Sequence, residues 1–218
     1  MKWLQGTGTS GGIAEGPVYV VRKKQYDIRC LPFTDPEEEG KRFEAARQLA
    51  MERLSGLYET AVSRAGEESA QVFEIHRMML EDEEYLDCVR EGLGQWNAEW
   101  AVDRAGKQFA EMFRQMEDDY MRARAADVED ITRQLLSFLV GREGEDTDVS
   151  ELSSDGPVIL AAEDLTPSET VRLDKSRILA FLTAKGSANS HTAILARSMG
   201  IPAVAALGAE ILTVENGT

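Results

Sequence analysis

The chain has 218 residues, of which 43% are hydrophobic, and its 39 acidic and 24 basic residues give a formal net charge of -15. This length can bury one large core or two modest ones. The acidic excess argues against nucleic acid as a partner, because phosphates are bound mainly by Lys and Arg.

Two other bulk features concern the membrane and the redox compartment. No apolar run approaches the roughly 20 residues that cross a bilayer, so direct membrane insertion is not expected. The N-terminus lacks the pattern of a secretory signal, and Cys30 and Cys88 form neither a metal pattern nor a disulfide framework. We therefore expect a cytoplasmic protein.

Residues 3–23 begin with the glycine-rich run GTGTSGGIAEG and continue as PVYVVRK, which is typical of a strand. The glycines have no GxGxxG or GxxxxGK[ST] spacing, so we interpret them as a flexible lead-in rather than a phosphate loop. Residues 1–24 are predicted to be the first part of an α/β domain. Periodicity then disappears, and two prolines indicate a linker over residues 25–35.

Apolar residues recur at intervals of three and four over residues 36–141, which predicts a bundle of amphipathic helices. Helices are expected over residues 36–62, 69–80, 83–93, 99–125 and 128–140. Asp82 and Asp127 are candidate caps for two of them. The methionines of the fourth helix are interpreted as core, with a docking groove as the alternative.

Residues 142–155 are polar and irregular, which predicts a second linker. Residues 156–218 return to an α/β pattern, with strands expected in PVILAAE, RILAFLT and PAVAAL and a short helix over residues 167–172. The predicted fold is therefore an α/β domain interrupted by an all-α helical-bundle insertion.

His191 is the candidate catalytic residue. It follows the small residues GSANS and begins a helix, TAILARSMG, whose free amides and dipole favour an anion. Ser190 can cap this helix or donate its hydroxyl, and Arg197 is a candidate anion-binding group. An imidazole nitrogen can attack phosphorus, so these residues favour a phosphoryl-accepting histidine over a capping or core role.

The second histidine, His76, lies within an apolar helical stripe, VFEIHRMML. A structural histidine is the first interpretation, and contact with a partner is the second. Neither histidine has further metal ligands at a suitable spacing, and no GxSxG elbow is present. The residues therefore predict no metal site and no serine hydrolase.

Several segments together resemble a known family. SHTAILARSMGIPAV resembles the phosphohistidine signature of phosphoenolpyruvate-utilising enzymes, and AEDLTPSETVRL resembles the segment upstream of it. GIAEG, FEIHRMMLEDEEY and DDYMRARAADVEDI resemble one branch, Enzyme I of the bacterial phosphoenolpyruvate:sugar phosphotransferase system.

This resemblance implies a phosphotransferase of sugar uptake. His191 would take a phosphoryl group from phosphoenolpyruvate and pass it to a histidine of the carrier protein HPr, and Thr170 would hydrogen-bond His191. The helical insertion would dock HPr, with Glu68, His76, Glu84 and Arg124 as candidate contacts.

The chain departs from the family in two respects. In the loop that corresponds to the family pattern GGxTSH, this chain has Ser187 and Asn189 where a glycine and a threonine are usual. The family also continues into a phosphoenolpyruvate-binding barrel with Mg2+ and a dimer interface, so this chain is expected to be an N-terminal fragment. We therefore expect no cofactor in this part and no phosphorylation directly from phosphoenolpyruvate.

Two alternatives remain open at the level of sequence. One is the swivelling domain of a pyruvate phosphate dikinase or phosphoenolpyruvate synthase. The other is a non-catalytic module that docks a carrier without reacting with it.

Overall fold

The computed structural model describes residues 3–23, 26–31, 35–141, 156–188 and 190–217. The chain divides into two compact units. One unit, here called the α/β unit, consists of Met1–Lys24 and Thr147–Thr218, and the other, the helical unit, is Gln25–Asp146.

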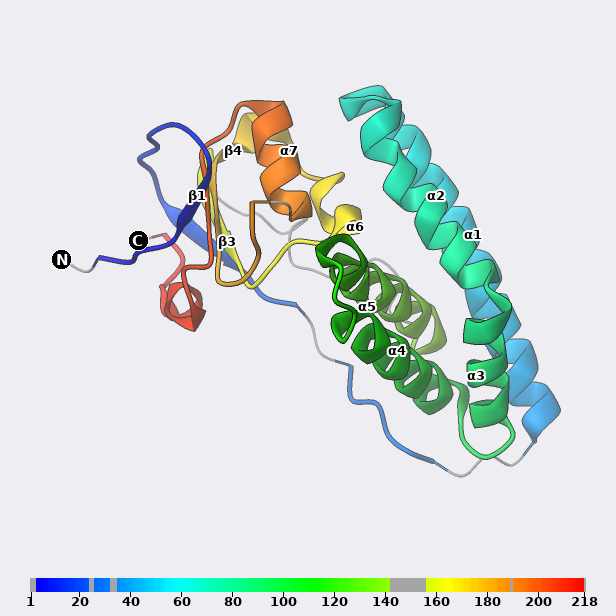
Figure 1. The fold of residues 1–218 in the computed structure, drawn as a ribbon. Coiled ribbons are helices and arrows are strands. Elements are labelled where there is room, and N and C mark those ends of the chain that lie inside the picture. The colour runs from blue at the N-terminus through cyan, green and yellow to red at the C-terminus, as the bar shows by residue number, and fades with distance from the viewer. Residues whose placement is uncertain (1–2, 24–25, 32–34, 142–155, 189, 218) are drawn as a thin grey trace. The chain divides into compact units, whose positions relative to one another are not determined.

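The α/β unit is built on a five-stranded sheet in the order β1-β5-β4-β3-β2 (Figure 1). The strands are β1 (Thr7–Ser10), β2 (Val18–Val21), β3 (Val158–Ala162), β4 (Ile178–Thr183) and β5 (Ala203–Ala205). From β2 to β5 each neighbouring pair is parallel, whereas β1 runs antiparallel to β5. The first segment of the chain therefore pairs with strands that follow the helical unit in sequence.

Strand β1 contradicts the interpretation of the glycine-rich run as a flexible lead-in. Thr7 is in register with Ala205, and the Thr9 hydroxyl donates to the Ala203 carbonyl at 3.2 Å. A Cβ added at Gly6 would lie 2.6 Å from the Ala205 carbonyl oxygen, so the backbones approach closely there. Gly6 is therefore needed for strand pairing. The sequence pattern did not predict this strand, because a short polar edge strand has no alternating hydrophobic residues.

Both faces of the sheet are covered. Leu160 and Ala162 of β3 belong to one hydrophobic cluster, together with Ala196 of helix α7 (His191–Met199). Ala161, between them in sequence, belongs to a second cluster with Ile211 of the 3-10 helix η3 (Ala209–Thr213). Alternate residues of a strand point to opposite faces, so β3 is buried on both sides and reads as a continuous apolar run.

The helical unit contains five α-helices among its described residues: α1 (Pro36–Ala65), α2 (Glu67–Glu81), α3 (Glu83–Leu93), α4 (Ala98–Arg114) and α5 (Asp119–Leu139). Helices α1 and α2 pack together, as do α3 and α4, and α4 and α5. The Asp82 carboxylate accepts from the Tyr85 amide at 3.0 Å, which confirms this predicted cap of α3. None of the helices in the described ranges is both long and apolar enough to cross a membrane.

The single helix predicted over residues 99–125 is wrong. Helix α4 ends at Arg114, and α5 begins after Asp118, whose carboxylate accepts from the Met121 amide at 2.9 Å. Asp127, predicted to cap a helix, is instead buried within α5. No glycine or proline marks the break, so the sequence pattern appeared continuous across it.

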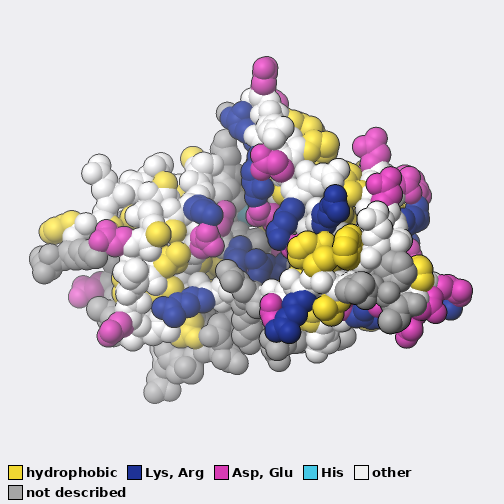
Figure 2. Space-filling view, turned by 90° about the horizontal axis from the view of Figure 1, so that it is seen from below, with side chains coloured by type: hydrophobic (Ala, Val, Ile, Leu, Met, Phe, Trp, Pro, Cys, Tyr) yellow, Lys and Arg dark blue, Asp and Glu magenta, His cyan; other side chains and the backbone are white. Residues whose placement is uncertain are grey.

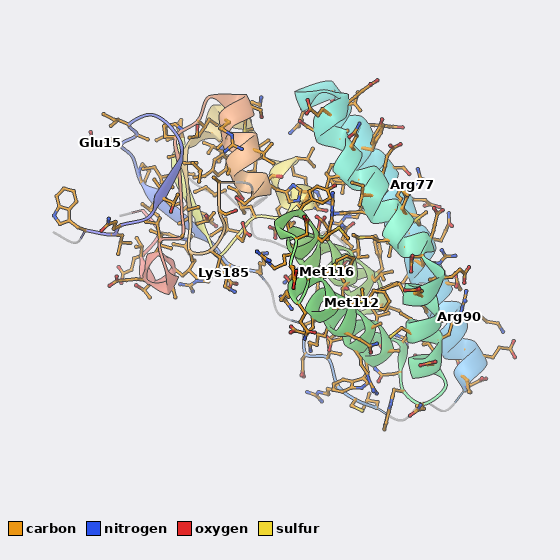
Figure 3. The ribbon with its side chains drawn as sticks, viewed as in Figure 1. Glu15, Arg77, Arg90, Met112, Met116 and Lys185 are labelled. Carbon is orange, nitrogen blue, oxygen red and sulfur yellow. The ribbon has the colours of Figure 1, made fainter. Side chains whose placement is uncertain are left out.

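The break also changes the methionine stripe that was predicted to be core. Met112 is 44% exposed and Tyr120 is 65% exposed, whereas Ala101 and Ala105 are buried. Met112 and Met116 are labelled in Figure 3. Figure 2 shows exposed hydrophobic side chains of the helical unit bordered by Lys and Arg. The core interpretation therefore holds for the first half of α4 and is wrong for its end.

Candidate functional site

His191 is the first residue of α7. The hydroxyl of Ser190, the N-cap, accepts from the Ala193 amide at 3.3 Å, which confirms its predicted capping role. His191 itself is partly exposed. The first amides of a helix and the positive end of its dipole favour negative charge. A negatively charged group on the His191 imidazole would therefore be stabilised at the N-terminus of α7.

The loop before His191 is held by several local bonds. Gly186 has a φ of 95°, in the left-handed region, and an added Cβ there would lie 3.4 Å from the Ser190 hydroxyl oxygen. The Thr183 hydroxyl donates to the Lys185 carbonyl at 2.7 Å, and the Ser190 amide donates to the Ser187 carbonyl at 3.1 Å. Of the two unusual loop residues, Ser187 is exposed. Asn189 lies outside the described residues.

The loop is also tied to the segment that follows β3. The Lys185 amide donates to the Glu163 carbonyl at 2.9 Å, and the Lys185 ammonium pairs with the Glu163 carboxylate at 2.7 Å. Lys185 is labelled in Figure 3. The Lys185 end of the His191 loop is therefore fixed to the segment that follows β3.

Asp164 is the acidic residue that the structure adds to this site. Its carboxylate accepts from the Leu165 amide at 2.9 Å and from the Thr192 hydroxyl at 3.4 Å. Burial raises the pKa of Asp164, while the Leu165 amide, the charges of Lys23 and His191, and the Thr192 hydroxyl act in the opposite direction. The net effect is a raised pKa, so this carboxyl binds a proton more readily than an exposed aspartate.

Thr170 lies in the short helix α6 (Pro167–Thr170), which packs against α7. Its buried hydroxyl donates to the Pro167 carbonyl at 2.9 Å. A hydroxyl that donates one bond retains lone pairs that can accept another, so an imidazole N–H could still be received there. The predicted hydrogen bond to His191 stays a prediction.

Arg197 was predicted to bind anions. In the structure one of its guanidinium nitrogens, Nη1, donates to the carbonyl of Ala188 at 2.8 Å and to that of Thr9 at 3.2 Å. These bonds join α7 to the His191 loop and to β1. Arg197 therefore braces the loop, and a direct role with an anion remains a prediction.

His76, the second histidine, is fully buried in α2. Its Nε2 lies 3.2 Å from Asp127 Oδ1 and its Nδ1 lies 3.7 Å from Asp130 Oδ2, both in α5. A side chain with 0% exposure cannot touch a partner in this conformation, so the predicted direct contact is wrong. The first interpretation, a structural histidine, is confirmed.

The other candidate partner residues differ in their settings. Glu68 and Glu84 are exposed in the first turns of α2 and α3. The side chain of Arg124 is only 13% exposed, and its guanidinium pairs with Asp127 at 2.9 Å and bonds the Tyr120 hydroxyl. The two glutamates are therefore accessible, whereas Arg124 belongs largely to the buried network around His76.

A metal centre is not indicated. In the parts of the chain that the structure describes, no group of three His, Cys, Asp or Glu side chains could hold a metal ion. The chemistry available at His191 is that of an imidazole beside a helix start.

Sequence reasoning missed three participants in this site: Asp164, Lys23 and Thr9. Thr192 and Asp164 are 28 residues apart in sequence, and Arg197 and Thr9 are 188 apart. The aspartate after a buried strand was a usable signal, because parallel strands bring their carboxyl ends to one edge of a sheet. Lys23 and Thr9 offered no comparable signal.

Comparison with known proteins agrees with this arrangement. Residues 5–124 match the family model of the N-terminal part of PEP-utilising enzymes, and residues 154–218 match the model of their mobile domain. The chain belongs to the PEP-utilising enzyme family. The resemblance of its His191 segment to that family is thereby confirmed.

Its relatives include phosphoenolpyruvate-protein phosphotransferases. The one from Bacillus subtilis is 36% identical over 219 residues, which cover all of this chain and 38% of the relative. The one from Listeria monocytogenes is 37% identical over 205 residues, covering 93% of this chain and 35% of the relative. The chain thus spans little more than a third of the length of these relatives.

Solved structures show the same fold. An NMR structure of the protein Enzyme I (nEIt) aligns with a TM-score of 0.74 and 32% identity, covering 99% of this chain and 87% of the other. The N-terminal domain of a nitrogen Enzyme 1 aligns with a TM-score of 0.59 at 23% identity, which supports the fold alone. The predicted α/β domain with an all-α insertion is confirmed.

Proposed function

We propose that His191 is a phosphoryl relay, which exchanges a phosphoryl group with a histidine of an HPr-like carrier protein. The position of His191 as the first residue of α7, beside the Ser190 cap, carries this proposal. A helix start favours the negative charge that the ring acquires, and partial exposure gives a second protein access to the ring.

The reaction at His191 is a transfer between two imidazoles. The lone pair of one His191 nitrogen forms a new N–P bond as the N–P bond of the carrier breaks, and the carrier ring leaves with that electron pair. His191 gives up the proton of its other ring nitrogen to solvent, and the carrier ring takes one up. Protons and charge therefore balance without a metal or a further reactant.

In the longer relatives, which are named phosphoenolpyruvate-protein phosphotransferases, phosphoenolpyruvate is the named phosphoryl source. We extend this to the present protein: phosphoenolpyruvate would charge His191 with the help of residues outside this chain. A Mg2+ requirement would belong to that step. The chain itself would catalyse only the exchange with the carrier.

The helical unit is the proposed docking surface for the carrier. Glu68 and Glu84 are exposed acidic residues, and Met78 between them in sequence is 67% exposed on α2. Arg90 in α3, labelled in Figure 3, pairs with Glu83 and Asp87 beside Glu84. An exposed methionine among carboxylates suits a partner with a basic rim and an apolar centre.

The relay is tested by incubating the chain with 32P-labelled phosphocarrier. We expect acid-labile label on the wild-type chain and none on His191→Ala, a loss of at least 100-fold. The control is Ser198→Ala, an exposed position later in α7, which should retain the label. Persistent labelling of His191→Ala would falsify the relay, and carrier binding without exchange would favour the non-catalytic docking module.

The docking surface is tested by charge reversal. Glu68→Lys combined with Glu84→Lys should weaken carrier binding roughly 10-fold in a titration at low salt, because repulsion replaces attraction. Glu15→Lys is the matched control, since Glu15 is exposed in the α/β unit. Equal affinities for the double variant and the control would contradict docking through these helices.

A further inference from the structure

We propose that Asp164 is a positioning residue for His191, which fixes the first turn of α7 through Thr192 and keeps the imidazole readily able to release its phosphoryl group. The inference rests on the proposed relay and adds a residue to it.

The geometry is that of a clamp between two segments. Asp164 follows β3, and its Oδ1 is oriented by the amide of the next residue, Leu165, at 2.9 Å. The Thr192 hydroxyl lies 3.4 Å from that same oxygen and 3.4 Å from the Leu165 carbonyl. Thr192 is the second residue of α7, so the bond fixes the turn that carries His191.

Burial protects the hydrogen bonds of this clamp from water. Thr192 is 2% exposed and Leu165 is 3% exposed, so water cannot readily replace the bonds between them. The arrangement differs from an ordinary surface turn, in which a solvated carboxylate would cap a backbone amide without holding a second element.

The charge acts on what His191 carries. Asp164 interacts electrostatically with His191 and with Lys23. Through this interaction the Asp164 carboxylate repels the negative charge of a phosphoryl group on the ring. This repulsion disfavours the phosphorylated ring relative to the unphosphorylated one. Asp164 should therefore favour donation over storage of the phosphoryl group.

The closing experiment compares Asp164→Asn with the wild-type chain at about pH 8, where carboxyl groups are ionised. Asparagine keeps an oxygen that can accept from Leu165 and Thr192 but removes the charge. In exchange with phosphorylated carrier, the equilibrium should shift toward phosphorylated His191 by roughly two- to fivefold. A residue with a purely structural role would change the rate without shifting the equilibrium in that direction.

A second readout does not need the carrier. The chain is phosphorylated with the small-molecule donor phosphoramidate, and 31P NMR follows hydrolysis of the resulting phosphohistidine. In this hydrolysis a water oxygen bonds to phosphorus as the N–P bond breaks. The ring nitrogen keeps the electron pair and is reprotonated. The phosphohistidine of Asp164→Asn should survive roughly two- to fivefold longer. If exchange fails in the wild type while this lifetime difference holds, the carrier relay is wrong and the role of Asp164 stands.

Three further variants separate charge from geometry. Thr192→Val removes the clamp and keeps the charge, so it should slow exchange and leave the equilibrium unchanged. Glu15→Gln makes the same charge change at an exposed residue of the α/β unit outside the site and should leave both readouts at wild-type values. If Asp164→Asn does not fold, Asp164→Ser serves in its place. Wild-type equilibrium and lifetime in whichever of these two variants folds would overturn the proposal.

Discussion

The two histidines of this chain show how the same side chain acquires different roles. His76 is fully enclosed between α2 and α5, with two carboxylates of α5 within 3.7 Å of its ring nitrogens. His191 begins α7, is partly exposed and interacts electrostatically with the carboxylate of Asp164. Both rings therefore have acidic neighbours, and the difference lies in access.

The difference in access gives His76 a role in stability and His191 a role in chemistry. A ring that is closed in on all sides can hold helices together but cannot meet phosphorus on another protein. A ring at a helix start contributes little to packing and can accept a group from outside. The comparison predicts that substitutions at the two positions affect different measurements, as follows.

The largest effect on stability is expected for His76→Ala. The substitution leaves a cavity and removes a partner from the buried carboxylates of Asp127 and Asp130, so we expect a loss of about 3 kcal/mol in the free energy of unfolding. Urea unfolding followed by circular dichroism of the helices measures it. Met78→Ala, at an exposed position two residues further along α2, is the control and should change little.

A smaller effect is expected for Ser190→Ala. The cap bond to the Ala193 amide is lost, which should lower the free energy of unfolding of the α/β unit by about 1 kcal/mol. Because the cap also orients the first turn, phosphoryl exchange should slow as well. Ser190→Thr, which keeps the hydroxyl, should recover most of the free energy of unfolding and most of the exchange rate. Failure of this rescue would argue against the capping role.

The smallest effect on stability is expected for His191→Ala, although the same variant should lose phosphoryl exchange completely. A partly exposed residue in the first turn of a helix buries less surface than a fully enclosed one, so the change should stay within about 0.5 kcal/mol. Urea unfolding of this variant beside His76→Ala tests the comparison directly. A large destabilisation by His191→Ala would mean that the ring is part of the core after all.

The sequence predicted most of the fold because its patterns are local. The apolar stripes located α1, α2 and α3, and the continuous apolar runs located β3 and β4, since each pattern reflects burial of one element. The break between Arg114 and Asp119 was missed because its residues are all compatible with a helix. Strand β1 was missed because its stability comes from pairing with β5, almost 200 residues later.

The candidate site divides in the same way. Ser190 and His191 were found from their neighbours in sequence, because a cap and a helix start are local features. The Asp164 carboxylate and the Thr9 carbonyl meet α7 only through tertiary structure. His76 was ambiguous for the same reason, since its burial depends on carboxylates 51 and 54 residues away.

The placement of β2 beside β3 has a consequence for how the chain folds during synthesis. The two strands pair in parallel, Val18 with Ile159, yet the whole helical unit is made between them. The helical unit depends on contacts within its own stretch and can form as soon as that stretch leaves the ribosome. Strands β1 and β2 must wait unpaired until β3 to β5 emerge, so the strands that are made first find their partners only after the helical unit has been made.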